Sequence, residues 1–416
     1  MTSSPGALIL GGALGSLGAI RSLGRKGVPV AYVTHDNRLP KFSRYVRLFS
    51  EWPGPEYPDA LEALLGLAER HGLKGWVVLA GADAEMRFLS QNRERLSAVF
   101  RVPTPSWDVV RWAYDKHLTY DRAAEIGIGY PRSFYPRSRA ELDGIECRFP
   151  VILKPTRREA RNAFTLAKAW RANDPKALRS LYSRAVELVG ADAIVMQEMI
   201  PGGGEAQFSY AALWQDGEAL ASMVAVRTRQ YPMEFGYTSS LVRSVENVDV
   251  EEAAKRFLRS LDFSGLVEIE FKYDARDDTY NILDVNARIW NWISLGDAVG
   301  IDFAYLAWRQ AMDLPVEPVR AEGDAVWLHA SRDVAAALQE RGAGLLTWKS
   351  YRRSLAGKRA FGVFAADDPL PAIVENPMLA VRLLTRRVPI MLGTLLRRGE
   401  QDDEDAPKAD KRAPGA

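Results

Sequence analysis

The chain has 416 residues, of which 47% are hydrophobic, and this is enough for two or three domains with apolar cores of their own. Its 55 lysines and arginines nearly balance 53 aspartates and glutamates, so the net charge is only +2. Proteins that bind nucleic acid usually carry a basic excess, and the charge balance therefore argues against that class.

Several features favour the cytoplasm. The single cysteine, Cys147, cannot form an internal disulfide, which is typical of a reducing compartment. No uninterrupted apolar run reaches the ~18 to 20 residues of a transmembrane helix. The first residues lack the basic region of a signal peptide, and four scattered histidines give no pattern for a zinc site. We therefore expect a soluble cytoplasmic protein.

Residues 1–105 predict an α/β domain. Apolar strands are expected at residues 7–10, 28–33 and 75–79, and helical periodicity separates them, with helices ending near Arg25 and Arg70. Continuous apolar strands that alternate with helices are typical of a parallel sheet covered on both faces.

A glycine-rich turn follows the first strand. Gly12, Gly15 and Gly18 are spaced three residues apart, and Asp36 follows the second strand. Such glycines could admit a dinucleotide pyrophosphate at the helix start, but the dinucleotide fingerprint requires G-x-G-x-x-G. A contact to a small substrate or phosphate, and a turn built only for packing, are the alternatives.

From residue 106 to residue 318 the pattern changes to α+β with antiparallel sheets. A helix is expected at 107–128, a short strand at 164–167, and a hairpin at 265–273 and 280–285; four further strands are expected at 149–155, 191–199, 207–214 and 219–227. Residues 319–399 are expected to form a C-terminal helical extension. The charged residues 400–416 are expected to be disordered.

The predicted hairpin carries the strongest chemical signal. Alternation places Glu268 and Glu270 on one face of the first strand, and Asp284, Asn286 and Arg288 on one face of the second. Burying several carboxylates together is costly unless a cation neutralises them. Oxygen ligands of this kind suit Mg²⁺, which takes one or two carboxylates together with phosphates and water. The alternative is a polar face that meets solvent.

Two lysines lie where they need anionic partners. Lys154 ends an otherwise apolar strand directly before Pro155, and Lys116 lies in the helix predicted at 107–128. Taken singly, each is more often a solvated surface lysine. Together with the acidic hairpin they suggest bound phosphates.

The order of these motifs resembles the ATP-grasp superfamily, in particular its carboxylate–amine ligase branch of D-aspartate ligase-type enzymes and ATP-dependent carboligases. The resemblance spans roughly residues 7–315 and rests on Lys116, then Phe149–Pro155, then Val195–Gly202, then Glu270–Phe271, then Asp284–Arg288. It implies a Rossmann-like pre-ATP-grasp domain at 1–105. It further implies an ATP-grasp domain at 106–318, whose two α+β subdomains clasp ATP.

The resemblance also implies roles for individual residues. Lys116 and Lys154 would contact the α- and β-phosphates of ATP. The hinge between subdomains would be Gln197, Glu198, Met199 and Ile200, with the Glu198 and Ile200 backbones pairing with adenine. Glu205 would hold the ribose hydroxyls, and Lys168 would lie near the nucleotide.

Glu270, Asp284 and Asn286 match the Mg²⁺ ligands of the family, a site that Mn²⁺ could also occupy; Asp284 replaces the more frequent glutamate. Arg288 would steady the transferring phosphoryl group or the acyl phosphate. Arg227 would bind phosphate or the acceptor carboxylate, although a surface-strand position explains it equally well. The stretch 156–163 departs from the family, because it has three arginines and no glycine where a glycine-rich hairpin usually covers the phosphates.

The implied reaction activates a carboxylate with ATP as an acyl phosphate, which an amine then attacks to form an amide. The alternatives are a Rossmann-type NAD oxidoreductase and a non-catalytic ATP-binding regulator. The expected partners are small-molecule carboxylates and amines, without nucleic acid, and a homodimer is an open hypothesis. Residues 377–398, which mix leucines with five arginines, could contact a membrane surface, although a helix packed on the domain is more common.

Overall fold

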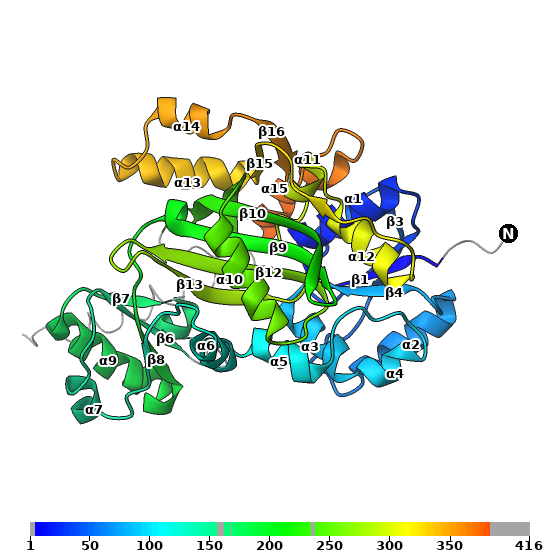
Figure 1. The fold of residues 1–416 in the computed structure, drawn as a ribbon. Helices are drawn as coiled ribbons and strands as arrows, with labels where there is room; N and C mark the ends of the chain where they lie inside the picture. Colours follow the sequence, from blue (N-terminus) through cyan, green and yellow to red (C-terminus); the bar gives the residue numbers. More distant parts are fainter. Residues whose placement is uncertain (1–4, 156–161, 168, 234–237, 383–416) are drawn as a thin grey trace, which may run out of the picture. The chain divides into compact units, whose positions relative to one another are not determined.

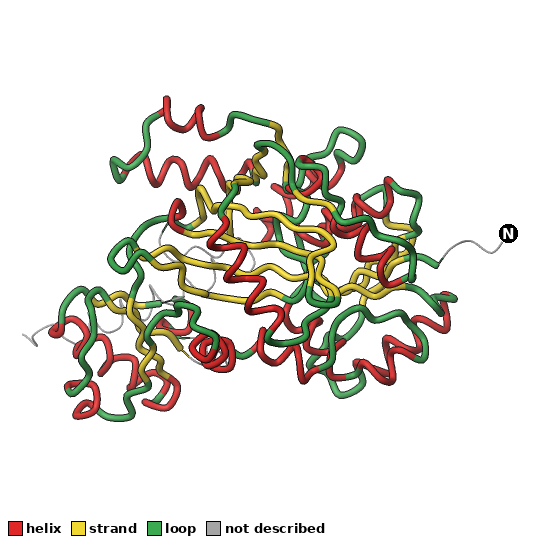
Figure 2. Tube along the Cα trace, viewed as in Figure 1, coloured by secondary structure: helices red, strands yellow, loops and turns green. Residues whose placement is uncertain are grey.

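The structure is a computed structural model that describes residues 5–155, 162–167, 169–233 and 238–382 (Figure 1). The chain forms two compact units, Met1–Gly362 and Val363–Ala416. The first unit contains three β-sheets, whose strands are drawn in yellow in Figure 2. No helix among the described residues is both long and apolar enough to cross a membrane.

The first sheet is the predicted parallel one, with strand order β3-β2-β1-β4. Its strands are β1 (Ala7–Leu10), β2 (Val30–Thr34), β3 (Val46–Glu51) and β4 (Val77–Ala80). Every residue of β1, β2 and β4 is buried, as their continuous apolar runs predict. The helices of this region are α1 (Leu14–Arg25), α2 (Ala60–His71), α3 (Asp83–Gln91) and α4 (Arg93–Ser97).

The glycine-rich turn between β1 and α1 is explained by packing. A Cβ atom on Gly12 would lie 2.4 Å from the Gly81 carbonyl oxygen, and one on Gly15 would lie 2.4 Å from the Trp290 carbonyl oxygen. At Gly18 a Cβ atom would lie 3.1 Å from a methyl carbon of Ile293. The close approach of neighbouring groups explains why these positions are glycine, so packing alone accounts for this turn.

The largest sheet has the order β13-β12-β9-β10-β11-β15-β16, and β14 pairs with β10. Its first five strands in chain order are β9 (Gln207–Gln215), β10 (Glu218–Tyr231), β11 (Thr238–Val245), β12 (Gly265–Asp274) and β13 (Thr279–Asn286). Helices α10 (Val248–Arg259) and α12 (Phe303–Ala311) both contact β9, and α11 (Leu295–Ala298) lies before α12. One continuous apolar core joins side chains of the first sheet to those of this sheet.

A third, smaller sheet has the order β5-β8-β6-β7. Its strands are β5 (Ser133–Phe134), β6 (Val151–Pro155), β7 (Trp170–Ala172) and β8 (Ile194–Glu198). Helix α7 (Arg139–Asp143) lies between β5 and β6 in the chain, and α9 (Pro175–Val189) lies between β7 and β8. Its apolar core is separate from that of the larger sheets, and Val151, Leu153 and Met196 belong to it. Two α+β parts within residues 106–318 are thus present, as the resemblance implied.

Two predicted elements differ in the structure. The helix expected at 107–128 is divided into α5 (Trp107–Tyr114) and α6 (Lys116–Glu125), because the Asp115 side chain accepts a hydrogen bond from the His117 backbone NH and caps α6. The prediction of a strand at 164–167 is wrong. Residues Ala163–Leu166 form a helical turn, α8, whose Asn162 caps it and pairs with Thr165 in a capping box.

The C-terminal extension is not only helical. Strands β14 (Val319–Arg320), β15 (Ala325–Leu328) and β16 (Lys358–Phe361) join the largest sheet, and helices α13 (Ala330–Gly342) and α14 (Trp348–Ser354) lie between β15 and β16 in the chain. In the second unit the structure describes α15 (Leu370–Arg382), with Pro377 inside it. The expected disordered tail and most of residues 377–398 lie outside the described residues.

Candidate functional site

The acidic hairpin is formed by β12 and β13 in the predicted way. Glu270 lies directly opposite Asp284, and Glu268 lies directly opposite Asn286. Because side chains two residues apart in a strand share one face, all four point to the same side of the sheet. The strand alternation alone therefore predicted this cluster correctly.

Glu270 is held between two neighbouring strands. Its Oε1 atom accepts a hydrogen bond from Arg227 of β10 at 2.8 Å, and its Oε2 atom accepts one from Gln207 of β9 at 2.9 Å. Both Arg227 and Glu270 are largely buried. The surface-strand interpretation of Arg227 is thus wrong, since this guanidinium faces the acidic cluster.

Asp284 forms an ion pair with Lys116, whose Nζ atom lies 2.7 Å from Oδ1 and 3.1 Å from the Leu283 carbonyl oxygen. Partial burial alone would lower the pKa of Lys116, but the carboxylate outweighs it and holds this pKa above its ordinary value. Lys116 is the first residue of α6, where the helix dipole disfavours a cation. Asp284 offsets that cost.

Glu268 is the most deeply buried member of the cluster. Its Oε2 atom accepts a hydrogen bond from Asn286 at 2.9 Å, while Oε1 has no hydrogen-bond partner among the described residues. Burial raises the pKa of Glu268 to about 7, and the nearby Glu270 carboxylate adds to the rise. The Ser209 hydroxyl and two arginines favour the ionised form without outweighing burial.

Arg288 connects this cluster to the first sheet. Its Nε and NH2 atoms donate to Asp83 at 2.7 and 3.2 Å, NH2 also donates to Asn286 Oδ1 at 2.7 Å, and NH1 donates to the Ile289 carbonyl at 3.0 Å. Asp83 begins α3, directly beyond the end of β4. The sequence analysis missed Asp83, because no local spacing relates it to a hairpin 205 residues later.

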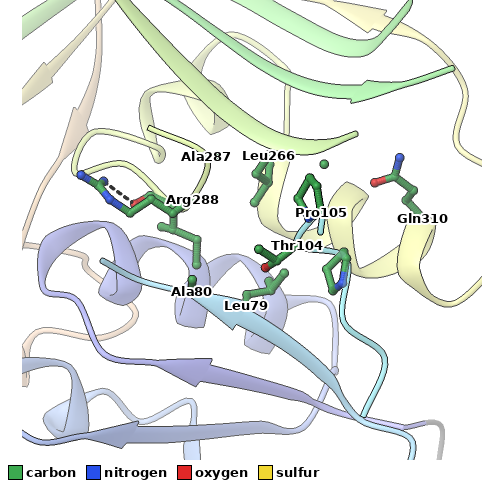
Figure 3. A pocket seen from close by; sticks show the side chains of 12 residues that line it. Leu79, Ala80, Thr104, Pro105, Leu266, Ala287, Arg288 and Gln310 are labelled. Atoms are coloured by element: carbon green, nitrogen blue, oxygen red, sulfur yellow. Dashed lines mark hydrogen bonds between the residues drawn. The ribbon is translucent and has the colours of Figure 1, made fainter. Parts of the chain in front are cut away.

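A small cavity lies beside Arg288 (Figure 3). Its volume is about 20 Å³, and its lining includes Leu79, Ala80, Pro105, Leu266 and Ala287. A space of this size holds a water molecule but no substrate. The cavity therefore does not mark the site, which lies on the polar side of the β12–β13 hairpin.

The second predicted lysine belongs to the smaller sheet. Lys154 donates to Gln197 Oε1 at 2.8 Å, and Gln197 Nε2 donates to the Ser133 hydroxyl at 2.9 Å. Tyr120 connects this group to the acidic hairpin: its hydroxyl donates to the Leu283 carbonyl at 3.2 Å and interacts with both Lys116 and Gln197. Tyr120 was not predicted, since its place in α6 gives no signal in the sequence.

The predicted hinge is already well bonded. The Glu198 carboxylate accepts from Arg132 at 3.2 Å and from the Arg148 backbone NH at 3.0 Å, and the Glu198 NH donates to the Arg132 carbonyl. Met199 donates its NH to the Pro150 carbonyl. The Glu198 backbone NH and one of its carboxylate oxygens are therefore already bonded within the protein.

Glu205 lies in an exposed turn after the hinge, where its carboxylate accepts a hydrogen bond from the Gly203 NH at 2.9 Å. This turn is held on the large sheet by Lys272, which donates to the Gly202 carbonyl at 2.8 Å. Burial lowers the pKa of Lys272, and the Arg227 cation adds to this effect while Glu205 opposes it. Lys272 is a further cation near the site that the sequence analysis missed.

The structure thus joins six predicted residues in one contact network: Lys116, Arg227, Glu270, Asp284, Asn286 and Arg288. Lys168 and the arginines of 156–161 lie outside the described residues. Within the described part of the chain, no group of three or more His, Cys, Asp or Glu side chains could by itself hold a metal ion. The hairpin instead offers two opposed carboxylates and an amide, with one buried carboxylate oxygen unpaired among the described residues. Mg²⁺ is typically bound by such a partial set, completed by phosphates and water.

Comparisons with known proteins support the predicted fold. No protein-family model matches the chain. D-aspartate ligase from Enterococcus faecium (strain Aus0004) is 22% identical over 244 residues, covering 56% of this chain and 58% of the relative. The match thus spans little more than half of that enzyme.

Among solved structures, L-amino acid ligase from Bacillus licheniformis superposes with a TM-score of 0.58 at 17% identity, covering 76% of both chains. N5-carboxyaminoimidazole synthase from Aspergillus clavatus, solved with ADP and 5-aminoimidazole ribonucleotide, gives 0.57 at 18% identity over 78% of this chain and 82% of the other. The chain therefore has the ATP-grasp fold predicted from its sequence. Its relatives by sequence and by structure include ligases of that superfamily, in agreement with the resemblance.

Proposed function

We propose that this protein is an ATP- and Mg²⁺-dependent ligase that activates a carboxylate as an acyl phosphate and couples it to an amine. The observation that carries the proposal is the set of cations that face the polar side of the hairpin. Arg227 of β10 pairs with Glu270, Lys116 of α6 pairs with Asp284, and Arg288 donates to the Asn286 amide oxygen. Paired carboxylates with cations beside them are what a metal-bound triphosphate requires.

Each residue has a role in the proposal. Lys116 and Lys154 bind the α- and β-phosphates, and Arg227 and Arg288 face the phosphoryl group that is transferred. Gln197 to Ile200 hold the adenine, Glu205 holds the ribose, and Glu270, Asp284 and Asn286 hold the metal. When bound, Mg²⁺ would neutralise charge on the β- and γ-phosphates.

The chemistry proceeds in two steps. An oxygen of the substrate carboxylate attacks the γ-phosphorus, the bond from that phosphorus to the β-phosphate oxygen breaks, and ADP leaves. The amine nitrogen then attacks the acyl carbon, phosphate leaves with the acyl C–O electron pair, and the nitrogen loses a proton. Asp83 and Asn286 hold the Arg288 guanidinium. In the proposal this guanidinium stabilises charge on the transferring group, and a group held in place before the reaction lowers the barrier.

The proposal is tested by measuring ADP release with panels of carboxylic acids and amines, including D- and L-amino acids. We expect release that requires ATP, Mg²⁺, one acid and one amine together, with a new amide detected by mass spectrometry. A variant with Asp284 and Asn286 both changed to Ala should release none. Asp249→Ala, at an exposed carboxylate in the first turn of α10, is the matched control. Mg-ATP binding without turnover on any pair would overturn the proposal in favour of a regulator.

A further inference from the structure

The chain from the last residues of α13 through α14 to β16 carries a strong excess of positive charge. Residues 341–359 contain six lysines and arginines and no aspartate or glutamate, whereas the whole chain has a net charge of only +2. The six are Arg341, Lys349, Arg352, Arg353, Lys358 and Arg359, and all are exposed. In the described part of the chain none of them forms an ion pair, so their charge is not compensated.

The same region exposes large apolar side chains. Val334 and Leu338 are 52% and 54% exposed, and Leu345 and Trp348 are 71% and 48% exposed. On α13, Val334, Leu338 and Arg341 follow helical spacing and share the solvent face, while Ala336 and Ala337 are buried on the opposite face. The solvent face of α13 therefore carries two large apolar side chains, Val334 and Leu338.

Apolar and basic side chains meet in one surface. The Arg341 guanidinium, near the end of α13, lies 5.1 Å from the centre of the ring of Trp348, the first residue of α14. This contact joins the two helices. Arg352 follows Trp348 by one helical turn, and Leu345 lies in the exposed connection between the helices. Figure 1 shows α13 and α14 as neighbouring helices joined by this short connection.

We propose that this surface, made by α13, the 343–347 connection and α14, binds the anionic headgroups of a lipid membrane. Leu345 and Trp348 enter the interface, where an amphipathic ring and an aliphatic chain are both favoured. The basic side chains bind the negative surface, and each contributes about a fivefold gain in affinity. A nucleic acid would use the cations but gives no role to exposed Leu345, Leu338 and Val334, so the lipid surface fits better.

The surface is rigidly attached to the strand that carries Arg227. Arg229, two residues later on β10, donates to Asp333 of α13 and to the Ser354 hydroxyl of α14. Its guanidinium also lies 4.8 Å from the centre of the Tyr351 ring. Membrane binding through α13 and α14 would therefore hold the acidic hairpin at a fixed distance from the membrane.

The test is sedimentation of the full-length protein with vesicles of phosphatidylcholine, alone or mixed with phosphatidylglycerol. We expect binding only to the anionic vesicles, weakened by salt. Changing Lys349, Arg352 and Arg353 to Gln should weaken binding about a hundredfold, since three contacts of about fivefold each are lost. Leu345→Ser with Trp348→Ser should abolish the binding that remains at high salt.

A matched control changes three exposed cations elsewhere, Arg47, Lys74 and Lys176, to Gln, which removes the same charge. This control should bind vesicles like the unmodified protein, and thermal unfolding confirms that all variants fold. Equal loss in the control and in the α14 variant would overturn the proposal. So would unchanged binding in the α14 variant, which would move the contact to residues 377–398. Binding of RNA or DNA without vesicle binding would also overturn it.

Discussion

The ion pair between Arg229 of β10 and Asp333 of α13 allows a quantitative prediction that needs no substrate. The two side chains are 2% and 0% exposed, and two hydrogen bonds of 2.9 and 3.0 Å join them. Asp333 also accepts a hydrogen bond from Ser240 at 3.1 Å, and the Arg229 NH1 atom donates to Ser354 at 2.8 Å. Both charges are therefore buried, and each has several hydrogen-bond partners.

Removing one residue of this pair leaves the charge of the other buried and unpaired. Asp333→Ala leaves the Arg229 cation without a counter-ion, and breaking a buried pair in this way lowers the free energy of unfolding by about 3–5 kcal/mol. Unfolding entropy is about 2.1 cal/mol/K per residue, so a unit of 362 residues has about 0.75 kcal/mol/K in total. The expected fall in Tm is therefore about 4–7 °C.

Scanning calorimetry of the purified protein measures this shift. Replacing both partners, Arg229→Met with Asp333→Leu, should recover most of the lost stability, because no charge is then left buried. The control is Glu62→Ala, which removes an exposed carboxylate from its pair with Arg95 and should cost below about 1 kcal/mol. A fall no larger than that of the control, or a double variant less stable than Asp333→Ala, would refute the reasoning.

Four further predictions concern the site and the pH dependence. Changing Asp284 and Asn286 to Ala should abolish ADP release in a variant that still folds, with a lower Tm because the buried Glu268 carboxylate loses its Asn286 partner; normal release would exclude them as metal ligands. Lys154→Ala should weaken ATP binding about 10- to 100-fold by calorimetric titration, the loss expected for one charge-assisted contact, and unchanged affinity would exclude the phosphate role. Asp83→Asn should lower kcat about 10- to 100-fold with a smaller change in KM for ATP, and Asp83→Glu should restore part of it; equal effects on kcat and KM would contradict a positioning role. Burial raises the pKa of Asp297 to about 7, with Asp302 adding to the rise, so the folded state binds more protons than the unfolded state between about pH 4 and pH 7. Its contribution to stability therefore falls as the pH rises through this window, and urea titrations of Asp297→Asn should lack that slope.

The hairpin was predictable because its information is local. Two strands that each alternate apolar and polar residues must bury the same face, so Glu268 and Glu270 on one strand had to meet Asp284 and Asn286 on the other. The buried strands of the first sheet were predictable for a similar reason, since β1, β2 and β4 are continuous apolar runs.

Other features depended on contacts that sequence spacing does not reveal. The strand β3 was missed because it is an edge strand with half-exposed side chains and no clear alternation. Residues 319–361 were expected to be helical, but β15 pairs with β11 and β16 pairs with β15. The paired residues of β11 and β15 are more than 80 positions apart in the sequence. Asp83 could not be predicted for the same reason, because only folding brings α3 next to Arg288.

The charge balance of the site explains how it can remain folded before ATP binds. Three cations of the site each bind a carboxylate. Lys116 binds Asp284, Arg227 binds Glu270, and Arg288 binds Asp83. Arg227 and Glu270 are largely buried, where a charge without a partner is costly, so their pair stabilises the cluster. The pairs of Lys116 and Arg288 are more exposed and contribute less to stability. On the proposed function, the phosphates of ATP replace the carboxylates as partners of Lys116 and Arg227, and the released Asp284 and Glu270 become free for the metal. Arg288 keeps Asp83, which lies in the first domain, and therefore stays in position while its neighbours exchange partners.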